Sequence, residues 1–404
     1  MRGLFPLLRV GFALALMALA APVAKGQEMA AGTEAGLQDW VAGFRGRALA
    51  AEISSATFDA AMADVHFLPD VVERDRKQDE FTKTIWDYLD KAVSDDRIAA
   101  GQKALKAQAD LLDRIEARYG VDRHVVLAIW GLESAYGAVR GDVPTLSALA
   151  TLAYDGRRGD FFEAELVGAL RIVQAKDVAP ARMLGSWAGA MGHTQFMPSS
   201  FLAYAVDYDG NGKPDVWGDD PTDALASTAA YLANFGWKTG ARWGDEVLLP
   251  EGFDYELAGN RTQKPVSAWA ALGLRGADSD LPKEAWAALL LPAGARGPAF
   301  LVYDNFAAIE AYNKADSYVI AVGHLADRIR GAGPFKAHWP RDLRALTLPE
   351  RIEMQSLLLQ AGLYGGEADG KIGPLTLSAV KAFQKSQGLI PDGYPSLEVL
   401  NRLR

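Results

Sequence analysis

Hydrophobic residues recur at helical spacing along the first half of the chain. From about residue 37 to residue 234 they return every three or four positions, which places them on one face of a helix. The clearest stretch contains Leu111, Leu112, Ile115, Tyr119, Val125, Val126 and Ile129. Ser54, Ser55 and Asp122 carry short polar side chains of the kind that cap helix N-termini. This part of the chain is therefore predicted to be helical.

The pattern changes between about residues 246 and 312, where glycine and proline separate short apolar runs. Runs of this kind, bounded by turn residues, are typical of strands, and we predict strands at residues 247–249, 286–291 and 300–303. A last helix is predicted over residues 317–330. The pattern predicts a mainly α (α+β) fold, in which a small β subdomain lies beside a helical lobe.

A separate compact unit is predicted at residues 344–404, after a linker that runs from residue 331 through residue 340. Its first helix is expected to contain Ile352, Leu357, Leu358 and Leu363. A turn follows at residues 369–374, and a second helix contains Val380 and Phe383. The unit is either a binding module or a helical cap that stabilises the rest of the chain.

One ionisable residue, Glu133, lies within the strongly apolar residues 126–137. On a helix it follows Ile129 by four positions and Val126 by seven, so it projects from the apolar stripe. Burial favours the neutral form of a carboxyl group, which is the form that a general acid needs. The alternative is a structural glutamate that the backbone or an arginine satisfies.

A second segment, residues 186–201, mixes glycine, hydrogen-bonding groups and large apolar side chains. Gly189 and Gly192 allow the backbone to approach another group closely. The polar groups are Ser186, His193, Thr194 and Gln195, and they lie among Trp187, Met191, Phe196 and Met197. Sugar rings present apolar faces and hydroxyl edges, so this mixture suits a carbohydrate ligand.

Together the two segments resemble the catalytic domain of lytic murein transglycosylases of the membrane-bound B type, and the resemblance runs from about residue 35 to the C-terminus. It implies a lysozyme-like helical catalytic domain at residues 35–335. Residues 373–389, followed by Asp392 and Gly393, resemble a three-helix peptidoglycan-binding module. The resemblance therefore implies a peptidoglycan-binding domain at residues 344–404, with peptidoglycan as substrate and other cell-wall enzymes as candidate partners.

The implied reaction uses a single carboxyl group. Glycosidases usually need two, and Asp160 and Glu163 are the nearest second candidates, which we expect to be solvated or paired with Arg157 and Arg158. The resemblance implies that protonated Glu133 donates to the glycosidic oxygen between N-acetylmuramic acid and N-acetylglucosamine. As a carboxylate it then accepts the proton of the muramyl C6 hydroxyl, which attacks C1 and forms a 1,6-anhydro end. No cofactor is expected for catalysis.

The same resemblance assigns further residues to the substrate site. Ser186 and Gln195 are expected to bind sugars or to orient the catalytic carboxyl group. Tyr231, Tyr312, Asn313 and Tyr318 are expected near Glu133, whereas Tyr231 judged by itself is more typical of a packed core tyrosine. Arg157 and Arg158 would meet lactyl or peptide carboxylates, or else form surface salt bridges. His193 and Thr194 stand where relatives often carry tyrosine and glycine.

Residues 207–215 match the front of an EF-hand loop, which binds calcium through oxygen atoms at alternate positions. The predicted ligands are Asp207, Asp209, Asn211, the backbone carbonyl of Lys213, and Asp215. The twelfth position is Gly218 instead of glutamate, so Asp219, Asp220 or Asp223 would have to close the site. The family carries a calcium site here that a later aspartate closes, and we favour Asp223. The alternative is a surface turn without metal.

The N-terminus predicts a secretory signal peptide at residues 1–24, because Arg2 and Arg9 precede an apolar run that ends in small residues. An uncleaved anchor is the alternative, although the run is shorter than the roughly 20 residues that span a membrane. The chain has no cysteine, so it offers no site for a lipid anchor. We expect a soluble periplasmic protein.

Net charge argues against nucleic acid as a partner. The signal peptide holds two of the 42 basic residues and none of the 51 acidic ones, so its removal leaves a formal charge of −11. Two other function classes stay open at this stage. One is a catalytically silent scaffold that binds peptidoglycan and recruits other wall enzymes. The other is a hydrolase of the lysozyme or chitinase kind.

Overall fold

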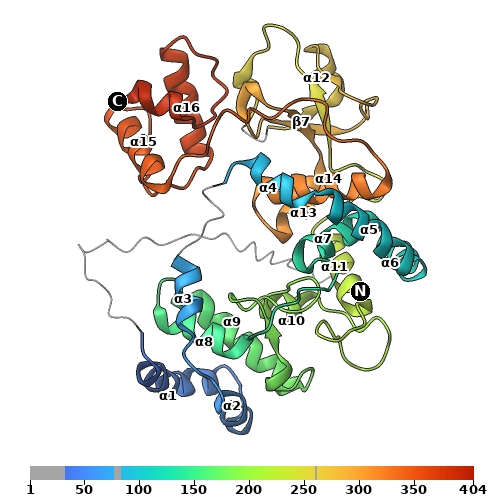
Figure 1. Ribbon diagram of the computed structural model, residues 1–404, viewed down its shortest axis with the longest axis vertical. Coiled ribbons are helices and arrows are strands. Elements are labelled where there is room, and N and C mark those ends of the chain that lie inside the picture. The colour runs from blue at the N-terminus through green and yellow to red at the C-terminus, as the bar shows by residue number, and fades with distance from the viewer. Residues whose placement is uncertain (1–31, 77–82, 260–261) are drawn as a thin grey trace, which may run out of the picture.

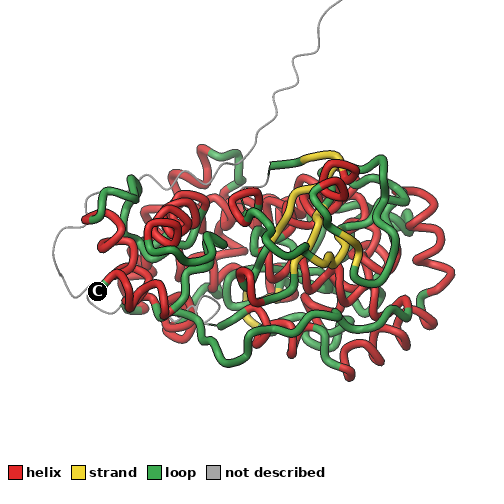
Figure 2. Tube along the Cα trace, turned by 90° about the horizontal axis from the view of Figure 1, so that it is seen from above, coloured by secondary structure: helices red, strands yellow, loops and turns green. Residues whose placement is uncertain are grey.

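The computed structural model describes residues 32–76, 83–259 and 262–404, and the predicted signal peptide lies outside them. The mainly helical α+β fold is confirmed (Figures 1 and 2). The strands form one five-stranded sheet and a two-stranded sheet of β1 (Val143–Pro144) and β2 (Leu184–Gly185). Ser54 and Asp122 cap helices as predicted, since their side chains accept hydrogen bonds from the backbone of Thr57 and His124. Ser55 is instead the first residue of its helix.

Two groups of helices share one hydrophobic core. The first group is α1 (Glu34–Ala50), α2 (Ser55–Met62), α3 (Pro69–Arg76), α8 (Thr145–Asp155), α9 (Gly159–Ala175) and α10 (Pro198–Tyr204). The second group is α4 (Ile85–Ala92), α5 (Asp95–Ala107), α6 (Ala109–Tyr119), α7 (Arg123–Ser134), α11 (Thr222–Asn234), α13 (Asp304–Tyr312) and α14 (Asp316–Arg330). Helix α7 packs along α14, which fixes the end of α7 relative to α13 and α14.

A five-stranded sheet of order β4-β6-β7-β3-β5 lies beside the second group. Its strands are β3 (Gly244–Leu248), β4 (Lys264–Pro265), β5 (Arg275–Gly276), β6 (Trp286–Leu290) and β7 (Ala299–Val302), with helix α12 (Val266–Ala271) between β4 and β5. Three-residue helical turns lie at Pro180–Arg182, Tyr255–Leu257 and Gly294–Arg296. The three predicted strands are present, with ends shifted by one to three residues.

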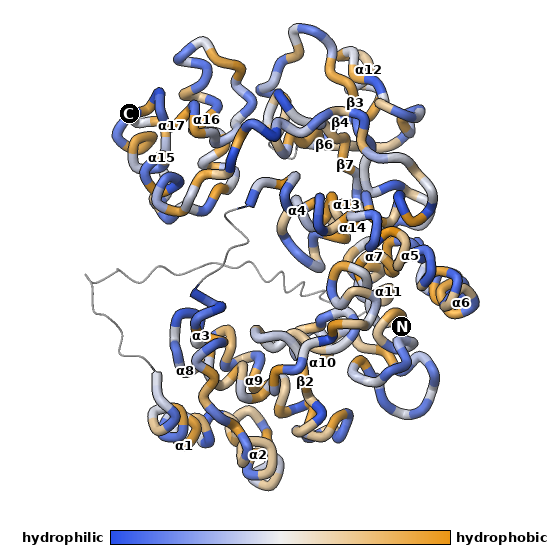
Figure 3. Tube along the Cα trace, viewed as in Figure 1, coloured by the Kyte–Doolittle hydropathy of each residue, from blue (hydrophilic) through white to orange (hydrophobic). Residues whose placement is uncertain are grey.

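The central strands are apolar because both faces of the sheet are buried. Phe300 and Val302 belong to the helical core, whereas their neighbours Ala299 and Leu301 pack with Trp269 of α12 in a second core. Successive side chains of a strand point to opposite faces, so burial on both sides requires a continuous apolar run. In Figure 3 the hydrophobic segments follow these strands and the central helices.

The C-terminal unit has its own small core and consists of α15 (Leu348–Gln360), α16 (Pro374–Ser386) and α17 (Leu397–Leu403). Leu363 was predicted on the first helix, but α15 ends at Gln360 and Leu363 packs against the core from the following turn. Among the described residues, we find no helix with the length and hydrophobicity needed to cross a membrane.

Candidate active site

Glu133 lies in the last turn of α7 and is half-buried. The hydroxyl of Tyr318, in the first turn of α14, donates a hydrogen bond of 2.6 Å to Glu133 Oε1. Burial, and then the nearby charge of Glu133, raise the pKa of Tyr318 well above its usual value. The phenol therefore stays protonated and holds the carboxyl group in one orientation.

The apolar stripe that drew attention to Glu133 is not what distinguishes this residue. Every side of α7 is buried from Val125 to Gly131, so the helix is surrounded by the core instead of showing it one face. Ala135 and Tyr136 then adopt left-handed backbone angles, with φ of 50° and 58°, and end the helix. Glu133 is half-buried because it stands at this end.

Tyr312, the last residue of α13, is a second phenol beside the carboxyl group. Its hydroxyl donates a 2.5 Å hydrogen bond to the carbonyl of Thr194. Burial first, and then the charge of Glu133, raise the pKa of Tyr312 well above its usual value. The structure thus brings Tyr312 and Tyr318 to Glu133, as the sequence predicted.

Tyr231 lies on α11 and packs into the aromatic group around Tyr312. Its ring centroid is 5.0 Å from that of Tyr312 and 5.9 Å from that of Phe196, and its hydroxyl donates to the carbonyl of Ala311 at 2.7 Å. Only 8% of Tyr231 is exposed. Burial raises its pKa to about 12. These contacts match the packed core tyrosine, and its contact with substrate stays a prediction.

The segment at residues 186–201 is an ordered loop, in which Met191 bridges to Gly185 and to Phe196. Ser186 Oγ accepts from the backbone nitrogen of Ala190 at 3.1 Å. Gln195 has a left-handed φ of 55°, and its Nε2 donates to the carbonyls of Arg140 and Gly192 at 3.0 and 2.8 Å. These bonds fix both side chains, whose contacts with sugar stay predictions.

The two glycines of this loop make room for protein atoms. A Cβ at Gly192 would lie 2.0 Å from the carbonyl oxygen of Val216, and one at Gly189 would lie 2.5 Å from Leu149 Cδ2. Both residues also have positive φ, which favours glycine. The close approach predicted for them is therefore explained by packing within the chain.

Asn313 follows Tyr312 and caps the turn between α13 and α14. Its Oδ1 accepts from the backbone nitrogen of Ala315 at 3.1 Å, and the residue is exposed. This bond helps to set the start of α14, which begins two residues before Tyr318. A direct role of Asn313 in substrate binding stays a prediction.

Arg157 and Arg158 both bind the carboxylate of Asp75, at 2.5 and 2.6 Å, and the Asp75 side chain is 1% exposed. The structure supports the salt-bridge alternative for these two arginines. The expected pairing of Glu163 with them is wrong, because Glu163 forms its ion pair with Arg47 at 2.7 Å. Asp160 lies exposed in the first turn of α9.

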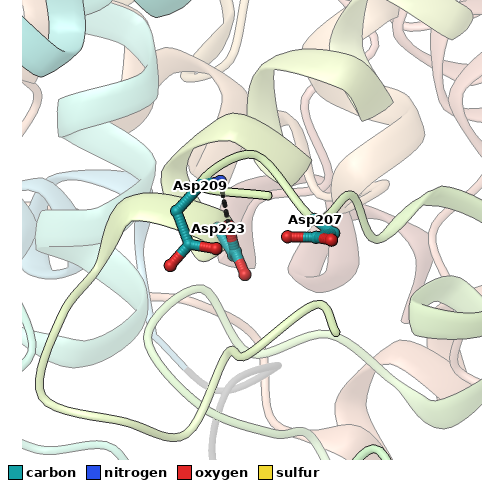
Figure 4. A group of neighbouring side chains, drawn as sticks. All are labelled: Asp207, Asp209 and Asp223. Carbon is teal, nitrogen blue, oxygen red and sulfur yellow. Dashed lines mark hydrogen bonds between the residues drawn. The ribbon is translucent and has the colours of Figure 1, made fainter. Parts of the chain in front are cut away.

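The predicted metal loop brings three carboxylates together. Oxygen atoms of Asp207, Asp209 and Asp223 lie within 4.8 Å of one another, and Asp223 comes from the first turn of α11 (Figure 4). Burial raises the pKa of Asp223, and the nearby charge of Asp209 adds to this effect. Hydrogen bonds from the backbone act in the opposite direction but are weaker. Hard oxygen ligands around a partly buried site suit a cation such as calcium.

Of the other predicted ligands, Asp215 is the one whose carboxylate lies outside this group of acidic side chains. Asp215 Oδ1 accepts from the backbone nitrogens of Trp217 and Gly218, at 2.8 and 2.9 Å. The side chain of Asn211 binds Asp209 Oδ2, and its Oδ1 accepts from the backbone of Lys213. Among the three closing aspartates considered, Asp223 is the one that meets Asp207 and Asp209.

Sequence reasoning missed a network of buried polar groups next to Glu133. Trp130 and Ser134, one turn apart on α7, both bind His193, through the ring and the backbone carbonyl respectively. Arg140 joins the same network through the carbonyl of Gly218. A histidine among apolar residues was a visible signal, but its partners are 25 to 63 residues away in the sequence.

This fold and site define a helical, lysozyme-like enzyme whose candidate acid, Glu133, is held by the phenol of Tyr318. The transglycosylase SLT domain family matches residues 36–327, and a putative peptidoglycan binding domain matches residues 347–403. The chain is 34% identical over 249 residues to membrane-bound lytic murein transglycosylase B of Escherichia coli (strain K12), a match that covers 60% of this chain and 66% of that protein.

Solved structures agree. SltB3 of Pseudomonas aeruginosa, in complex with NAG-anhNAM-pentapeptide, is 48% identical with a TM-score of 0.88, covering 91% of this chain and 99% of its own. The Escherichia coli lytic transglycosylase Slt35 in complex with calcium is 29% identical with a TM-score of 0.62, covering 74% and 93%. The chain belongs to the family of lytic transglycosylases with an SLT domain.

Proposed function

We propose that this protein is a lytic transglycosylase that cleaves the β-1,4 bond between N-acetylmuramic acid and N-acetylglucosamine in peptidoglycan and leaves 1,6-anhydro ends. The observation that carries the proposal is the half-buried carboxyl group of Glu133 at the end of α7, held by Tyr318 and flanked by Tyr312. Family membership and the anhydromuramyl ligand named for the SltB3 complex support it.

Glu133 performs both proton transfers. As an acid it donates to the glycosidic oxygen, so the bond to C1 breaks and the leaving sugar departs as an alcohol. The acetamido group of the substrate stabilises the cation-like centre at C1. As a carboxylate, Glu133 then takes the proton of the C6 hydroxyl, whose oxygen bonds to C1. The hydrogen bond from Tyr318 orients Glu133 through both transfers.

Both of the second carboxylates that the sequence offered lie on α9, in the first helix group, which argues against a hydrolase of the two-carboxylate kind. A hydrolase of the two-carboxylate kind needs a base or nucleophile about 5–10 Å from the acid. Of the two candidates in the sequence, Glu163 is committed to Arg47 and Asp160 starts α9 in the other helix group.

Substitution of the acid tests the proposal. Glu133→Gln keeps the shape and loses the transferable proton, so turnover of peptidoglycan should fall at least about a hundredfold while the melting temperature changes little. Glu163→Gln makes the same change at the other candidate and should retain activity. Release of soluble muropeptides from wall sacculi is the measurement. Near wild-type release by Glu133→Gln would reject the assignment.

We propose further that the loop at residues 207–223 binds a structural calcium ion. Asp207, Asp209 and Asp223 would supply carboxylate oxygens, and the calcium complex reported for Slt35 supports the choice of cation. When bound, the two positive charges of the ion would offset most of the repulsion among the three carboxylates and hold the loop in place. It takes no part in the proton transfers, which belong to Glu133.

We also propose that residues 1–24 are a secretory signal peptide, that the mature protein works in the periplasm without a lipid anchor, and that residues 344–404 bind the wall. The match to a peptidoglycan binding domain supports the last point. A substrate that lies outside the cytoplasmic membrane requires export, which supports the first.

A further inference from the structure

The turn that carries His193, Thr194 and Gln195 is held between the catalytic helix α7 and the later part of the 207–223 loop. On one side, Ser134 Oγ of α7 donates to the carbonyl of His193 at 2.5 Å. On the other, the backbone nitrogen of His193 donates to the carbonyl of Val216 at 3.0 Å. The backbone of the turn is therefore hydrogen-bonded to each of the two elements.

The imidazole of His193 connects the same two elements. The indole Nε1 of Trp130, which can only donate, binds His193 Nδ1 at 3.1 Å, so Nδ1 is an acceptor. The carbonyl of Gly218, which can only accept, lies 2.9 Å from Nε2, so Nε2 carries the hydrogen. Arg140 Nη1 also lies 3.3 Å from Nε2, but it can only donate and already binds the carbonyl of Gly218. The shorter contact with Gly218 therefore assigns the neutral Nε2–H tautomer, and only 3% of the residue is exposed. Burial lowers its pKa, in keeping with a neutral ring.

The surroundings leave room for this ring and for little else. A Cβ at Gly137 would lie 2.7 Å from His193 Nδ1 and Cε1. The guanidinium of Arg140 binds the carbonyl of Gly218 from the same region, and its Nη2 pairs with Asp219 at 2.8 Å. The backbone carbonyl of Arg140 in turn accepts from Gln195 at 3.0 Å. Displacement of the ring would therefore disturb the whole turn.

The turn reaches the reacting carboxyl group by two routes. The carbonyl of Thr194 accepts the hydroxyl of Tyr312, whose pKa responds to the charge of Glu133. Ser134, bound to the carbonyl of His193, is the residue next to Glu133. A shift of the turn therefore changes the positions of Tyr312 and of the end of α7 together.

We propose that His193 is a positioning residue of the transglycosylase reaction, which sets Glu133 and Tyr312 by tying the 193–195 turn to Trp130 on α7 and to the carbonyl of Gly218. This inference rests on the proposed function. Because His193 acts on the placement of the catalytic group, its loss should lower kcat by a larger factor than it raises KM.

Three variants of His193 test its hydrogen bond with Trp130 and its hydrogen bond with Gly218 separately. His193→Asn can keep the acceptor for Trp130, His193→Gln can keep the donor for Gly218, and His193→Leu keeps neither. His193→Leu should lower kcat on soluble glycan fragments about ten- to a hundredfold, the scale of a misplacement of about 1 Å, and the two amides should fall between it and the wild type. If His193→Leu does not fold, the two amides carry the comparison.

His324 supplies the matched control, because it is also a buried histidine, stacks on Phe335 at 3.7 Å and lies away from the turn. His324→Asn should lower the melting temperature and keep kcat. The inference would be overturned if the folded His193 variants keep the kcat of the wild type, or if their activity falls only through a higher KM. It would also be overturned if His324→Asn lowers kcat as much as they do. Wild-type release of anhydro ends tests the proposed function separately, so the two failures can be told apart.

Discussion

At the scale of single residues, the buried carboxylate of Asp75 explains why the chain carries Arg157 and Arg158, which the sequence had suggested as substrate-binding residues. This carboxylate accepts from Arg157 and Arg158, so removal of both arginines leaves a buried charge without its cations. Arg157→Ala combined with Arg158→Ala should lower the free energy of unfolding by about 2 kcal/mol or more. The KM for soluble glycan fragments should not change.

Thermal unfolding and steady-state kinetics check this prediction, and Arg45→Ala is the control. Arg45 pairs with exposed Asp59, so its loss should cost less than about 1 kcal/mol. A raised KM in the Arg157 and Arg158 double variant, with stability kept, would return both arginines to the substrate site.

The same ion pairs predict a pH dependence. Burial alone would raise the pKa of Asp75, but hydrogen bonds from Arg157 and Arg158 bring it below its usual value of 3.8. A lowered pKa in the folded protein adds stability that is fully present above pH 3.8 and is lost as the pH falls through the folded value. The stability difference between the wild type and the double arginine variant should therefore shrink in melts below pH 3.8.

The sequence indicated a functional residue where a polar group stands among apolar ones, as the carboxyl group of Glu133 does. The partners of these residues were not readable. Tyr318 is 185 positions from Glu133, and only the packing of α14 on α7 brings them together. His193 was visible as a departure from relatives, but its tautomer depends on Trp130 and Gly218, which no local pattern connects.

At the scale of elements, periodicity predicted which segments are helices and strands but not which faces are buried. The α7 helix is buried on all sides, and β6 and β7 on both, because each lies between other elements. The metal loop was predicted more completely, since its ligand types repeat at fixed spacing. Only the packing of α11 showed which aspartate meets the first two.

Calcium should raise the melting temperature more than magnesium does, because the loop offers several oxygens to a large, flexible coordination sphere. A hundredfold excess over Kd corresponds to a gain of about 2.7 kcal/mol. Asp207→Ala combined with Asp209→Ala should abolish the difference between the two ions. Asp220→Asn should keep it, since Asp220 caps Thr222 instead. If calcium does not change the melting temperature of the wild-type protein, the loop is a surface turn that binds no metal.

At the scale of the whole molecule, the C-terminal unit is attached at several points to the β subdomain beside it (Figure 1). Lys381 Nζ donates to the carbonyls of Tyr255 and Ala258, at 2.9 and 2.5 Å. Asp392 accepts from the backbone nitrogen of Ala295 at 2.8 Å. These bonds hold the predicted wall-binding unit in a fixed place beside the catalytic body.

The segment at residues 335–341, which precedes this unit, also contacts the catalytic body. Phe335 stacks on His324, and Arg341 pairs with Asp90 at 2.7 Å. The sequence predicted a linker from its glycine and proline content. It could not predict these contacts, because they depend on distant elements such as α4 and α14.

Deletion of residues 344–404 keeps this segment and removes the C-terminal unit, which has a separate core. Binding to wall sacculi, measured by sedimentation, should weaken because the unit raises the effective concentration of enzyme at the wall. Cleavage of soluble glycan fragments should persist. Equal losses on sacculi and on soluble fragments, with the fold retained, would mean that the unit shapes the active site.

The central claim is that the C6 hydroxyl of the substrate replaces water, with Glu133 as the only carboxyl group in the reaction. Mass spectrometry of peptidoglycan digested in water enriched in heavy oxygen tests it most directly. We predict muropeptide ends that are one water lighter than reducing ends and carry no heavy oxygen, and their disappearance in Glu133→Gln. Labelled reducing ends as the main product of the wild-type enzyme would contradict the account.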